Sequence, residues 1–249
     1  MESKIISLLT QRRKRKMSSV AGERRHEPIV SKTFATRGGS TVPLYDELQR
    51  MVVELSEYFV RDRSVVYALG SLTGPILDLL SSAHAGKEDV EFIGLDLSES
   101  RINEAAKTVN KANVRFDHDS IMDVELLPST NFVTALFAMQ FLTVAERRCL
   151  LTRVNQGLVE GGGLIVVEKI CGEHPCFEHI WAELYIDFSR RQGVTAKEIL
   201  KKAQSNRGAL KPITVAENRA LLHQSGFRWV EIFFKWYNWA GFLAIKKLL

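Results

Sequence analysis

Short, almost uninterrupted apolar runs alternate along the chain with longer segments in which apolar residues recur every three or four positions. Runs of the first kind are typical of buried strands, and segments of the second kind are typical of helices that pack on a sheet. The alternation predicts βαβ units, and therefore a parallel sheet with right-handed crossovers. Strands are predicted at residues 65–70, 90–97, 114–116, 132–139 and 164–170, and helices at residues 44–60, 75–85, 98–112 and 143–158.

The pattern changes in the last third of the chain. Residues 173–211 have helical periodicity, are rich in aromatic residues and are too long for a loop, so we expect an inserted helical cap. A further helix is expected to begin at Thr214, whose capping-box partner is Glu217, and to end at Gly226. The final segment, residues 228–249, predicts two antiparallel strands joined by a turn near residues 235–238.

Length and charge limit the class of protein. A chain of 249 residues with 45% apolar content fits one α/β domain, which we place at residues 36–249. Residues 1–33 hold nine Lys or Arg against three Glu, so the basic charge of the chain belongs to a tail. We interpret residues 1–35 as a basic N-terminal arm or a lid, in preference to a segment that contacts RNA.

The cysteines and the apolar runs narrow the class further. The three cysteines lack metal-ligand spacing, which predicts neither a disulfide framework nor a metal site. No apolar run approaches the length of about 20 residues that a membrane-spanning helix needs. We therefore expect a cytoplasmic protein that acts on a small molecule, without a membrane or nucleic-acid partner, and we leave a homodimer open.

Glycines and acidic residues at predicted strand ends mark a candidate ligand site. Gly70 and Gly74 follow the first strand, where a glycine turn lets backbone amides approach a ligand, although such glycines also form plain turns. Asp96 ends the second strand, where a carboxylate can bind both hydroxyls of a ribose. Residues 119–120 follow the third strand, with Asp117 nearby; an adenine contact and a helix N-cap are equal alternatives for Asp119.

The order of these elements resembles that of class I S-adenosylmethionine (SAM)-dependent methyltransferases, and within them the carboxy-S-adenosylmethionine synthase group. The resemblance covers residues 40–247, includes the antiparallel finish of the chain and is carried above all by the run at residues 139–169. It implies a Rossmann-like fold with a mostly parallel seven-stranded sheet, an antiparallel last strand and an inserted helical cap. The matching positions are Gln140, Phe141, Leu142, Glu146, Arg147, Gly157, Leu158, Glu168, Lys169, Asp187, Phe188, Ser225, Gly226, Phe227 and Asn238.

The resemblance implies that SAM binds at the strand ends without a metal. Its adenosine is expected against Asp96, Leu97 and residues 119–120, and its methionine part near Gly70 and Gln140. The predicted binding residues are Tyr45, Gly70, Ser71, Gly74, Asp96, Leu97, Asp119, Ser120, Phe137 and Gln140.

Three positions depart from the pattern of the group. Ala68 replaces the acid of the first glycine turn, Leu136 replaces an asparagine, and Ala203 replaces the arginine that would hold an added carboxylate. A carboxylate beside the methionine ammonium would raise the pKa of the ammonium by about 1–3 units and so keep it protonated. With Ala68 in that place, the pKa of the amine is expected to fall, so that a neutral nucleophile becomes available.

Aromatic residues are concentrated in the predicted cap and in the last strand pair. A ring face attracts a sulfonium, so Trp181, Tyr185, Trp236, Tyr237 and Trp239 form a candidate pocket for this cation, with ordinary core packing or a dimer surface as the alternatives. Tyr185 and Asp187 are candidate proton acceptors, and Asp187 could equally anchor the cap. With Gln140, they are the predicted catalytic residues.

Three functions are compatible with these features. The first, which we favour, is cyclisation of SAM by its own amine to azetidine-2-carboxylate with release of methylthioadenosine, a reaction of secondary, small-molecule metabolism; some enzymes on this fold resemble that description. The second is an O- or N-methyltransferase that produces S-adenosylhomocysteine from SAM and a small molecule. The third is a non-catalytic module that binds SAM or RNA. The retained Asp96, Gln140 and glycines argue against the third function.

Overall fold

The computed structural model describes residues 42–70 and 74–247. The predicted arm at residues 1–35 and the predicted ligand contact Ser71 lie outside the described residues. The strands are β1 (Val65–Leu69), β2 (Glu91–Asp96), β3 (Val114–His118), β4 (Thr130–Leu136), β5 (Gly163–Lys169), β6 (Phe227–Trp236) and β7 (Trp239–Lys246). The helices are α3 (Tyr45–Ser56), α4 (Pro75–Ala83), α5 (Glu99–Thr108), α6 (Val144–Gly157), α7 (Pro175–Arg191), α8 (Ala196–Asn206) and α9 (Val215–Gln224), with short 3₁₀ turns η1 (Ile121–Asp123) and η2 (Met139–Phe141).

All of these strands form one seven-stranded sheet in the order β3-β2-β1-β4-β5-β7-β6. β1 to β5 are parallel to one another, and β7 is inserted antiparallel between β5 and β6. The order reverses between β1 and β4, at the kind of switch point where parallel sheets bind ligands beyond the carboxyl ends of their strands. The predicted fold class, mostly parallel with an antiparallel last strand, is confirmed.

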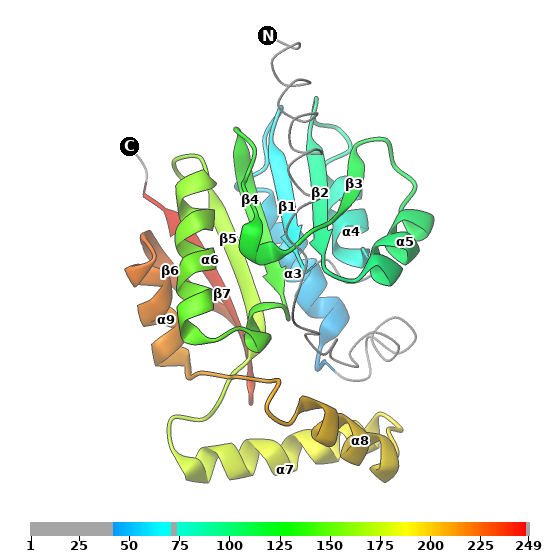
Figure 1. Cartoon of the computed structure of the whole chain (residues 1–249), viewed down its shortest axis with the longest axis vertical. Coiled ribbons are helices and arrows are strands. Elements are labelled where there is room, and N and C mark those ends of the chain that lie inside the picture. The colour runs from blue at the N-terminus through cyan, green and yellow to red at the C-terminus, as the bar shows by residue number, and fades with distance from the viewer. Residues whose placement is uncertain (1–41, 71–73, 248–249) are drawn as a thin grey trace, which may run out of the picture.

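Helices cover both faces of the sheet, and each face has its own apolar core. α6 and α9 pack on one face, where Leu150 and Leu221 are buried against the sheet (Figure 1). α3 and α4 pack on the other face through residues that include Leu48 and Leu77. The nearly continuous apolar strands in the sequence follow from this double coverage.

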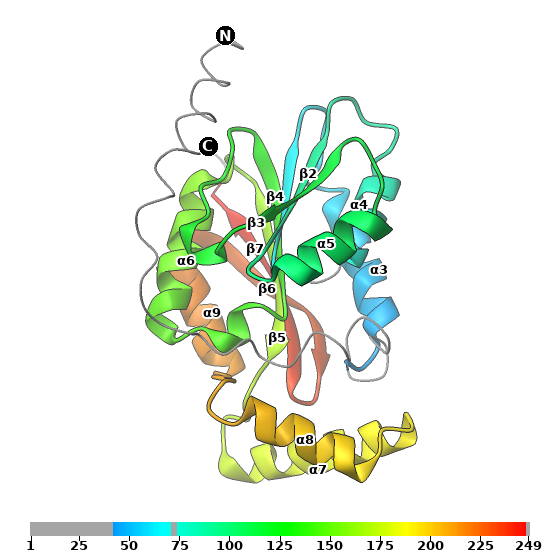
Figure 2. The same cartoon turned by 45° about the vertical axis from the view of Figure 1, so that its right-hand side comes forward.

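The cap is a pair of helices, α7 and α8, inserted between β5 and α9. Both views place the pair as a separate layer beyond the carboxyl ends of the parallel strands (Figures 1 and 2). Thr195 begins α8 with a capping box, and Pro175 lies in the first turn of α7. The cap therefore lies over the edge at which the predicted ligand site is found.

Element boundaries differ from the prediction mainly at strand ends. β4 ends at Leu136 instead of residue 139, because Phe137 has a positive φ of 61° and the chain then forms the 3₁₀ turn η2. α3 ends at Ser56 instead of residue 60. The predicted turn between the last two strands is a two-residue hairpin turn at Tyr237 and Asn238.

Candidate functional site at the carboxyl ends of the strands

The two glycines predicted to shape a ligand-binding turn have the geometry of one. Gly70 follows β1 with a φ of 70°, and its amide donates to the Leu95 carbonyl at 2.8 Å. A Cβ atom at this position would lie 2.6 Å from the Cβ of Ala138. Gly74 is the N-cap of α4 with a φ of 90°, and none of the described side chains caps it. Both glycines therefore have backbone conformations that favour glycine, and Gly74 begins a helix at the carboxyl end of β1, where a ligand can approach closely.

Asp96 ends β2 with a buried carboxylate. Its Oδ1 accepts from the Ser98 amide at 2.9 Å and from Arg101 Nη1 at 3.2 Å, and its Oδ2 lies 3.3 Å from the same nitrogen. Leu97 beside it is 61% exposed, as an apolar surface for a flat base would be. Sequence reasoning missed Arg101, although a basic residue in the first turn of the helix after an acidic strand end is a recognisable signal.

Residues 119–120 lie next to Asp96, as predicted. The Asp119 amide donates to the Asp96 carbonyl at 3.2 Å, so the ends of the second and third strands are joined at this point. Asp119 Oδ1 accepts from the Ser120 amide at 2.8 Å. The N-cap of the following 3₁₀ turn is Ser120, whose Oγ accepts from the Met122 amide at 3.1 Å, so the capping role considered for Asp119 belongs to its neighbour.

Two of the three positions that depart from the family pattern lie together. Ala68 and Leu136 are 2% and 6% exposed and belong to the same apolar cluster between the sheet, α3 and α4. Among the described residues, the buried carboxylates are those of Asp96 and Glu168, and each one is paired with an arginine. The strand ends therefore provide an apolar wall where an acid would be expected.

Three aromatic rings continue this wall. The Tyr45 and Phe137 ring centroids are 6.2 Å apart, and the Trp239 ring meets Phe137 edge-on at 5.5 Å. The backbone of Phe137 is in the left-handed region, which is costly for a bulky residue and is often found at functional sites. Its amide donates to the Val167 carbonyl at 2.7 Å, so the surrounding sheet holds the strained conformation in place.

Gln140 joins the ends of two strands. Its Nε2 donates to the Phe137 carbonyl at 3.1 Å, and its Oε1 accepts from the Lys169 amide at 3.0 Å. Its own carbonyl accepts from the Lys211 amide at 2.8 Å. The side chain is buried, and both of its polar ends already contact backbone. This geometry favours a positioning role for Gln140, and its predicted catalytic role stays a prediction.

The structure brings the predicted aromatic residues of the cap and the last hairpin together. Trp181 of α7 stacks on Tyr237 with centroids 5.2 Å apart, and Tyr237 lies 4.3 Å from Trp236. Phe188 links this group to the cap, with centroids 5.0 Å from Trp236 and 6.4 Å from Tyr185. The rings fasten the cap to the β6–β7 hairpin.

Not every ring in this group has a face available to a sulfonium. Trp181 is stacked between Phe177 and Tyr237, and the ammonium of Lys235 lies 5.5 Å from its centroid. Burial lowers the pKa of Lys235. Trp181 therefore anchors the cap, whereas Trp239 and Tyr185 lie against the apolar cluster that holds Ala68.

Asp187 does not lie beside the predicted proton acceptor Tyr185. Both belong to α7, but two residues correspond to about 200° around a helix. Tyr185 faces the sheet, and Asp187 is exposed on the other side of the helix. The proposed role of Asp187 as a proton acceptor is therefore not supported by its position.

Two lysines flank Tyr185: Lys169, which the sequence indicated only as a position matching the family, and Lys202, which the sequence did not single out. Lys202 Nζ of α8 lies 3.0 Å from the Tyr185 hydroxyl and 5.6 Å from the ring centroid, and Lys169 Nζ at the end of β5 lies 5.3 Å from the same centroid. Burial lowers the pKa of Lys169, and it lowers the pKa of Lys202 to about 8. Burial also raises the pKa of Tyr185, although Lys169 acts in the opposite direction.

A buried ion pair joins α6 to β5 near the carboxyl end of that strand. Arg147 and Glu168 are fully buried, and Arg147 Nη1 lies 2.8 Å from Glu168 Oε1. Arg147 also donates to the carbonyls of Leu142 and Lys211, at 3.2 and 2.6 Å. Burial raises the pKa of Glu168 to about 7, and Arg147 opposes this shift. The pair thus ties β5 and α6 to the segment that returns from the cap.

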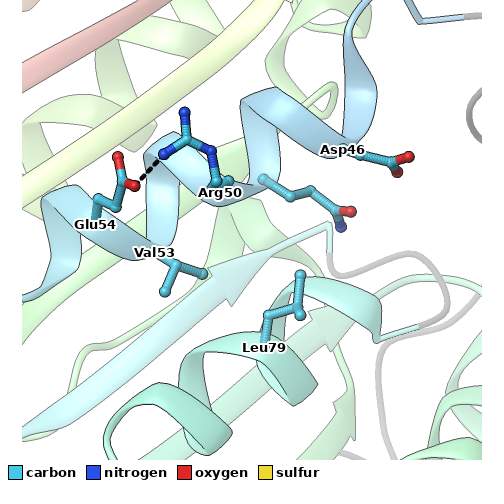
Figure 3. A pocket seen from close by; sticks show the side chains of 6 residues that line it. Asp46, Arg50, Val53, Glu54 and Leu79 are labelled. Atoms are coloured by element: carbon cyan, nitrogen blue, oxygen red, sulfur yellow. Dashed lines mark hydrogen bonds and ion pairs between the residues drawn. The ribbon is translucent and has the colours of Figure 1, made fainter.

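A hollow of about 350 Å³ between α3 and α4 is a different feature (Figure 3). It is lined by Asp46, Gln49, Arg50, Val53, Glu54 and Leu79. The Arg50 guanidinium pairs with the carboxylates of Glu47 and Glu54 on the outer side of α3. Because these ion pairs are exposed to solvent, we assign the hollow no role in binding or catalysis.

Residues 42–70 and 74–247 contain neither a candidate metal site nor a candidate membrane-spanning helix. No cluster of three or more His, Cys, Asp or Glu side chains in these ranges is arranged to hold a metal ion. None of the helices in the same ranges is long and apolar enough to cross a membrane.

Known proteins resemble this chain in sequence and in structure. A family model described as a methyltransferase domain matches residues 66–162. Carboxy-S-adenosyl-L-methionine synthase from Staphylococcus epidermidis is 32% identical over 206 residues, which span 83% of this chain and 89% of that protein. The protein of the same name from Methylococcus capsulatus is 32% identical over 210 residues, 83% of this chain and 86% of its own length. Human N-acetylserotonin methyltransferase in complex with SAM superposes with a TM-score of 0.53 at 14% identity, covering 86% of this chain and 58% of that one.

Proposed function

Because the chain belongs to the class I SAM-dependent methyltransferase superfamily, close to the carboxy-S-adenosyl-L-methionine synthases, we propose that it uses SAM in small-molecule metabolism and cyclises it to azetidine-2-carboxylate. One observation carries the proposal: Ala68 and Leu136 share an apolar cluster at the strand ends where the family pattern expects polar groups. Membership of the superfamily establishes an enzyme that depends on SAM; the cyclisation itself is our proposal.

The described residues fit SAM in two respects. The close approach of Gly70 to Ala138 makes a cradle that a Cβ atom would fill. Asp96 places a carboxylate at the adjacent strand end, where a ribose would be bound. Gly74, Leu97, Asp119 and Ser120 would complete the adenosine side, and Tyr45, Phe137 and Trp239 would lie along the methionine part. When bound, SAM supplies a sulfonium, which makes its neighbouring carbons electrophilic.

The charge state of the substrate amine decides between the proposed reactions. A nearby carboxylate would raise the pKa of the ammonium by about 1–3 units, whereas an apolar surrounding lowers it. The two buried carboxylates of the described residues are occupied by Arg101 and Arg147, and neither lies in the cluster around Ala68. An amine bound there would lose its proton more readily than in an ordinary methyltransferase site.

The cyclisation balances without a second reagent. The lone pair of the neutral amine forms a bond to the γ carbon, the bond from that carbon to sulfur breaks, and its electrons stay on sulfur in methylthioadenosine. The amine reaches this neutral form by losing one proton to water before the attack, and the product nitrogen carries the positive charge with its two remaining protons. The Tyr185 hydroxyl accepts a hydrogen bond from the Lys202 ammonium, so we propose that Tyr185 positions the substrate. Positioning and exclusion of water by the cap supply the rest of the catalysis.

Methyl transfer is the second candidate, and the match to a methyltransferase domain favours it. In that case an acceptor oxygen or nitrogen of a small molecule would enter beneath the cap. Formation of a carboxylated product is not proposed, because the position expected to hold the required arginine is Ala203, an exposed residue of α8.

Incubation of the purified full-length protein with SAM alone, followed by mass spectrometry, tests the proposal. We expect equimolar methylthioadenosine and azetidine-2-carboxylate. Turnover that begins only after an acceptor is added, with S-adenosylhomocysteine as product, would replace the proposal with methyl transfer. Binding of SAM without any product would indicate a non-catalytic module. Protein heated above its unfolding temperature is the control for spontaneous breakdown of SAM.

A further inference from the structure

The strongest unexplained feature of the described residues is a group of hydrogen-bond donors gathered under the cap. Lys169 ends β5, Lys202 lies on α8, and both ammonium groups lie within 6 Å of the Tyr185 ring centroid. Neither lysine forms an ion pair with an acid of the described residues. The Glu178 carboxylate of α7 favours the charged form of Lys169, whereas Lys202 disfavours it. Partly buried charges of the same sign disfavour each other, so a bound anion would stabilise this pair.

A third donor lies next to these lysines. Trp239 is directly paired with Lys169 in the register of β5 and β7, so the two side chains emerge on the same face of the sheet. The Trp239 side chain is 5% exposed, and its Nε1 has no hydrogen-bond partner. An unsatisfied buried donor costs about 1–3 kcal/mol, so such a group in a native structure indicates a missing acceptor.

The contacts place these donors at the edge of the sheet that carries the glycine turn. Gly70 packs against Ala138, and two residues later the Gln140 side chain accepts from the Lys169 amide. β1 and β5 are separated by β4, so their ends are about 10 Å apart. A flexible amino-acid chain that starts at Gly70 can span much of this distance, and a lysine side chain can span the rest.

We propose that Lys169, Lys202 and the Trp239 indole form a carboxylate-binding site, and that it binds the carboxylate of the amino-acid part of SAM. A carboxylate has two oxygens and about four acceptor positions, which matches two ammonium groups and one N–H donor. Because the amine and the carboxylate are borne by the same carbon, lysines that hold the carboxylate also lie close to the amine, and their positive charge would lower the pKa of its ammonium. The inference rests on the use of SAM but not on cyclisation.

Two ligands that differ by one carboxylate test this site. S-adenosylhomocysteine retains the carboxylate, and S-adenosyl-3-thiopropylamine has the same amine without it; calorimetry measures the affinity of each for the full-length protein. We expect Lys169→Met and Lys202→Met each to weaken S-adenosylhomocysteine by at least about tenfold, because bonds to charged groups are strong. Both variants should bind the decarboxylated ligand as well as the wild type does, or better.

Matched variants separate charge from packing. Lys201→Met changes the exposed neighbour of Lys202 and should bind both ligands normally. Lys202→Arg keeps the charge and should retain most of the affinity. Trp239→Phe keeps a ring without the N–H donor and should weaken only the ligand with the carboxylate, by a few fold.

Equal losses for both ligands, or no loss for either, would overturn the proposal. If the lysine variants bind S-adenosylhomocysteine normally but lose affinity for an acidic second substrate, the site binds a carboxylate from another source, and our assignment to SAM is wrong. Product analysis with SAM alone is a separate measurement. An enzyme that transfers methyl groups could therefore still have this carboxylate site, and a cyclase could lack it.

Discussion

At the scale of single residues, the proposed site depends on the absence of an acid at position 68 and on the positive charge of two lysines. Ala68 leaves the first strand end apolar, whereas Lys169 and Lys202 supply positive charge under the cap. Ala68 was recognised in the sequence as a departure from a local pattern around Gly70, and Lys169 only as a position that matches the family. The lysines are 33 positions apart and meet only because α8 folds back over the end of β5.

Gly70→Ala tests the close approach at the turn. The new Cβ would lie 2.6 Å from the Cβ of Ala138, and alanine would have to adopt the positive φ of this position. We therefore expect affinity for S-adenosylhomocysteine to fall by at least about tenfold, and the free energy of unfolding to fall by a smaller free energy than that of binding. Gly208→Ala is the matched control, since Gly208 has a φ of 74° but no atom within 4 Å of its added Cβ. Calorimetry and urea unfolding of both variants check this; equal effects on binding would contradict a contact role for Gly70.

The lowered pKa of Lys202 predicts a pH dependence of binding. Lys202 loses its proton above about pH 8 in the free protein, and a bound carboxylate would keep it protonated. Affinity for S-adenosylhomocysteine should therefore fall as the pH rises above 8, with Lys169 and Tyr185 as the ionisable neighbours of Lys202. In Lys202→Arg, this decline should be reduced, since arginine stays charged. A decline of equal size in both proteins would assign it to the ligand amine or to Lys169.

At the scale of elements, the sheet was predictable and the cap was only partly so. The apolar runs predicted β1 to β5 because both faces of the sheet are covered, and capping residues predicted the starts of α6 and α9. The left-handed Phe137 and the two-ended contact of Gln140 could not be predicted, since each depends on backbone groups of β5. The predicted aromatic residues lie on the cap and the last hairpin, and their role as a sulfonium pocket stays a prediction. Trp181 does not share that role in our proposal, because it stacks on Phe177 and Tyr237.

Arg147→Met tests the ion pair that joins these elements. The change leaves the Glu168 carboxylate buried without its partner, and we expect a loss of about 3–5 kcal/mol in the free energy of unfolding. Arg148→Met is the control, because Arg148 is exposed and its guanidinium donates to the side chain of Gln224. Chemical unfolding measures both. A similar, small loss in the two variants would show that the buried pair contributes little.

At the scale of the whole molecule, the cap and the sheet act together. The sheet has Gly70 and the Asp96 carboxylate, our proposed ribose contact, at one edge. The cap lies over that edge (Figures 1 and 2) and brings aromatic rings and Lys202 to it. Intramolecular attack within SAM requires a bent substrate and little water, and a cap fixed by stacked rings serves both needs. The family accounts for the use of SAM, and we propose that the departures at Ala68 and Leu136 direct its reactivity.

Trp181→Ala should loosen the cap as a unit. Trp181 stacks on Tyr237, so its removal is expected to reduce the turnover of SAM by about tenfold or more through lost positioning. Phe177→Ala, at a half-exposed residue of the same helix, is the control and should have a smaller effect. Limited proteolysis between α7 and α8, measured alongside turnover, should show faster cleavage in Trp181→Ala. If cleavage is faster but turnover is unchanged, the position of the cap does not contribute to catalysis.

The central claim is that the missing acid at position 68 leaves the substrate amine neutral. The most direct measurement compares methylthioadenosine release from SAM by Ala68→Asp and Ala68→Asn, two side chains of nearly equal size that differ in charge. Both are tested for folding by circular dichroism and for binding of S-adenosylhomocysteine. We expect Ala68→Asp to release methylthioadenosine about 10- to 1,000-fold more slowly than Ala68→Asn near neutral pH. The difference should narrow at high pH, where the substrate amine is neutral in both variants. Equal rates in two folded variants that bind the ligand would contradict it.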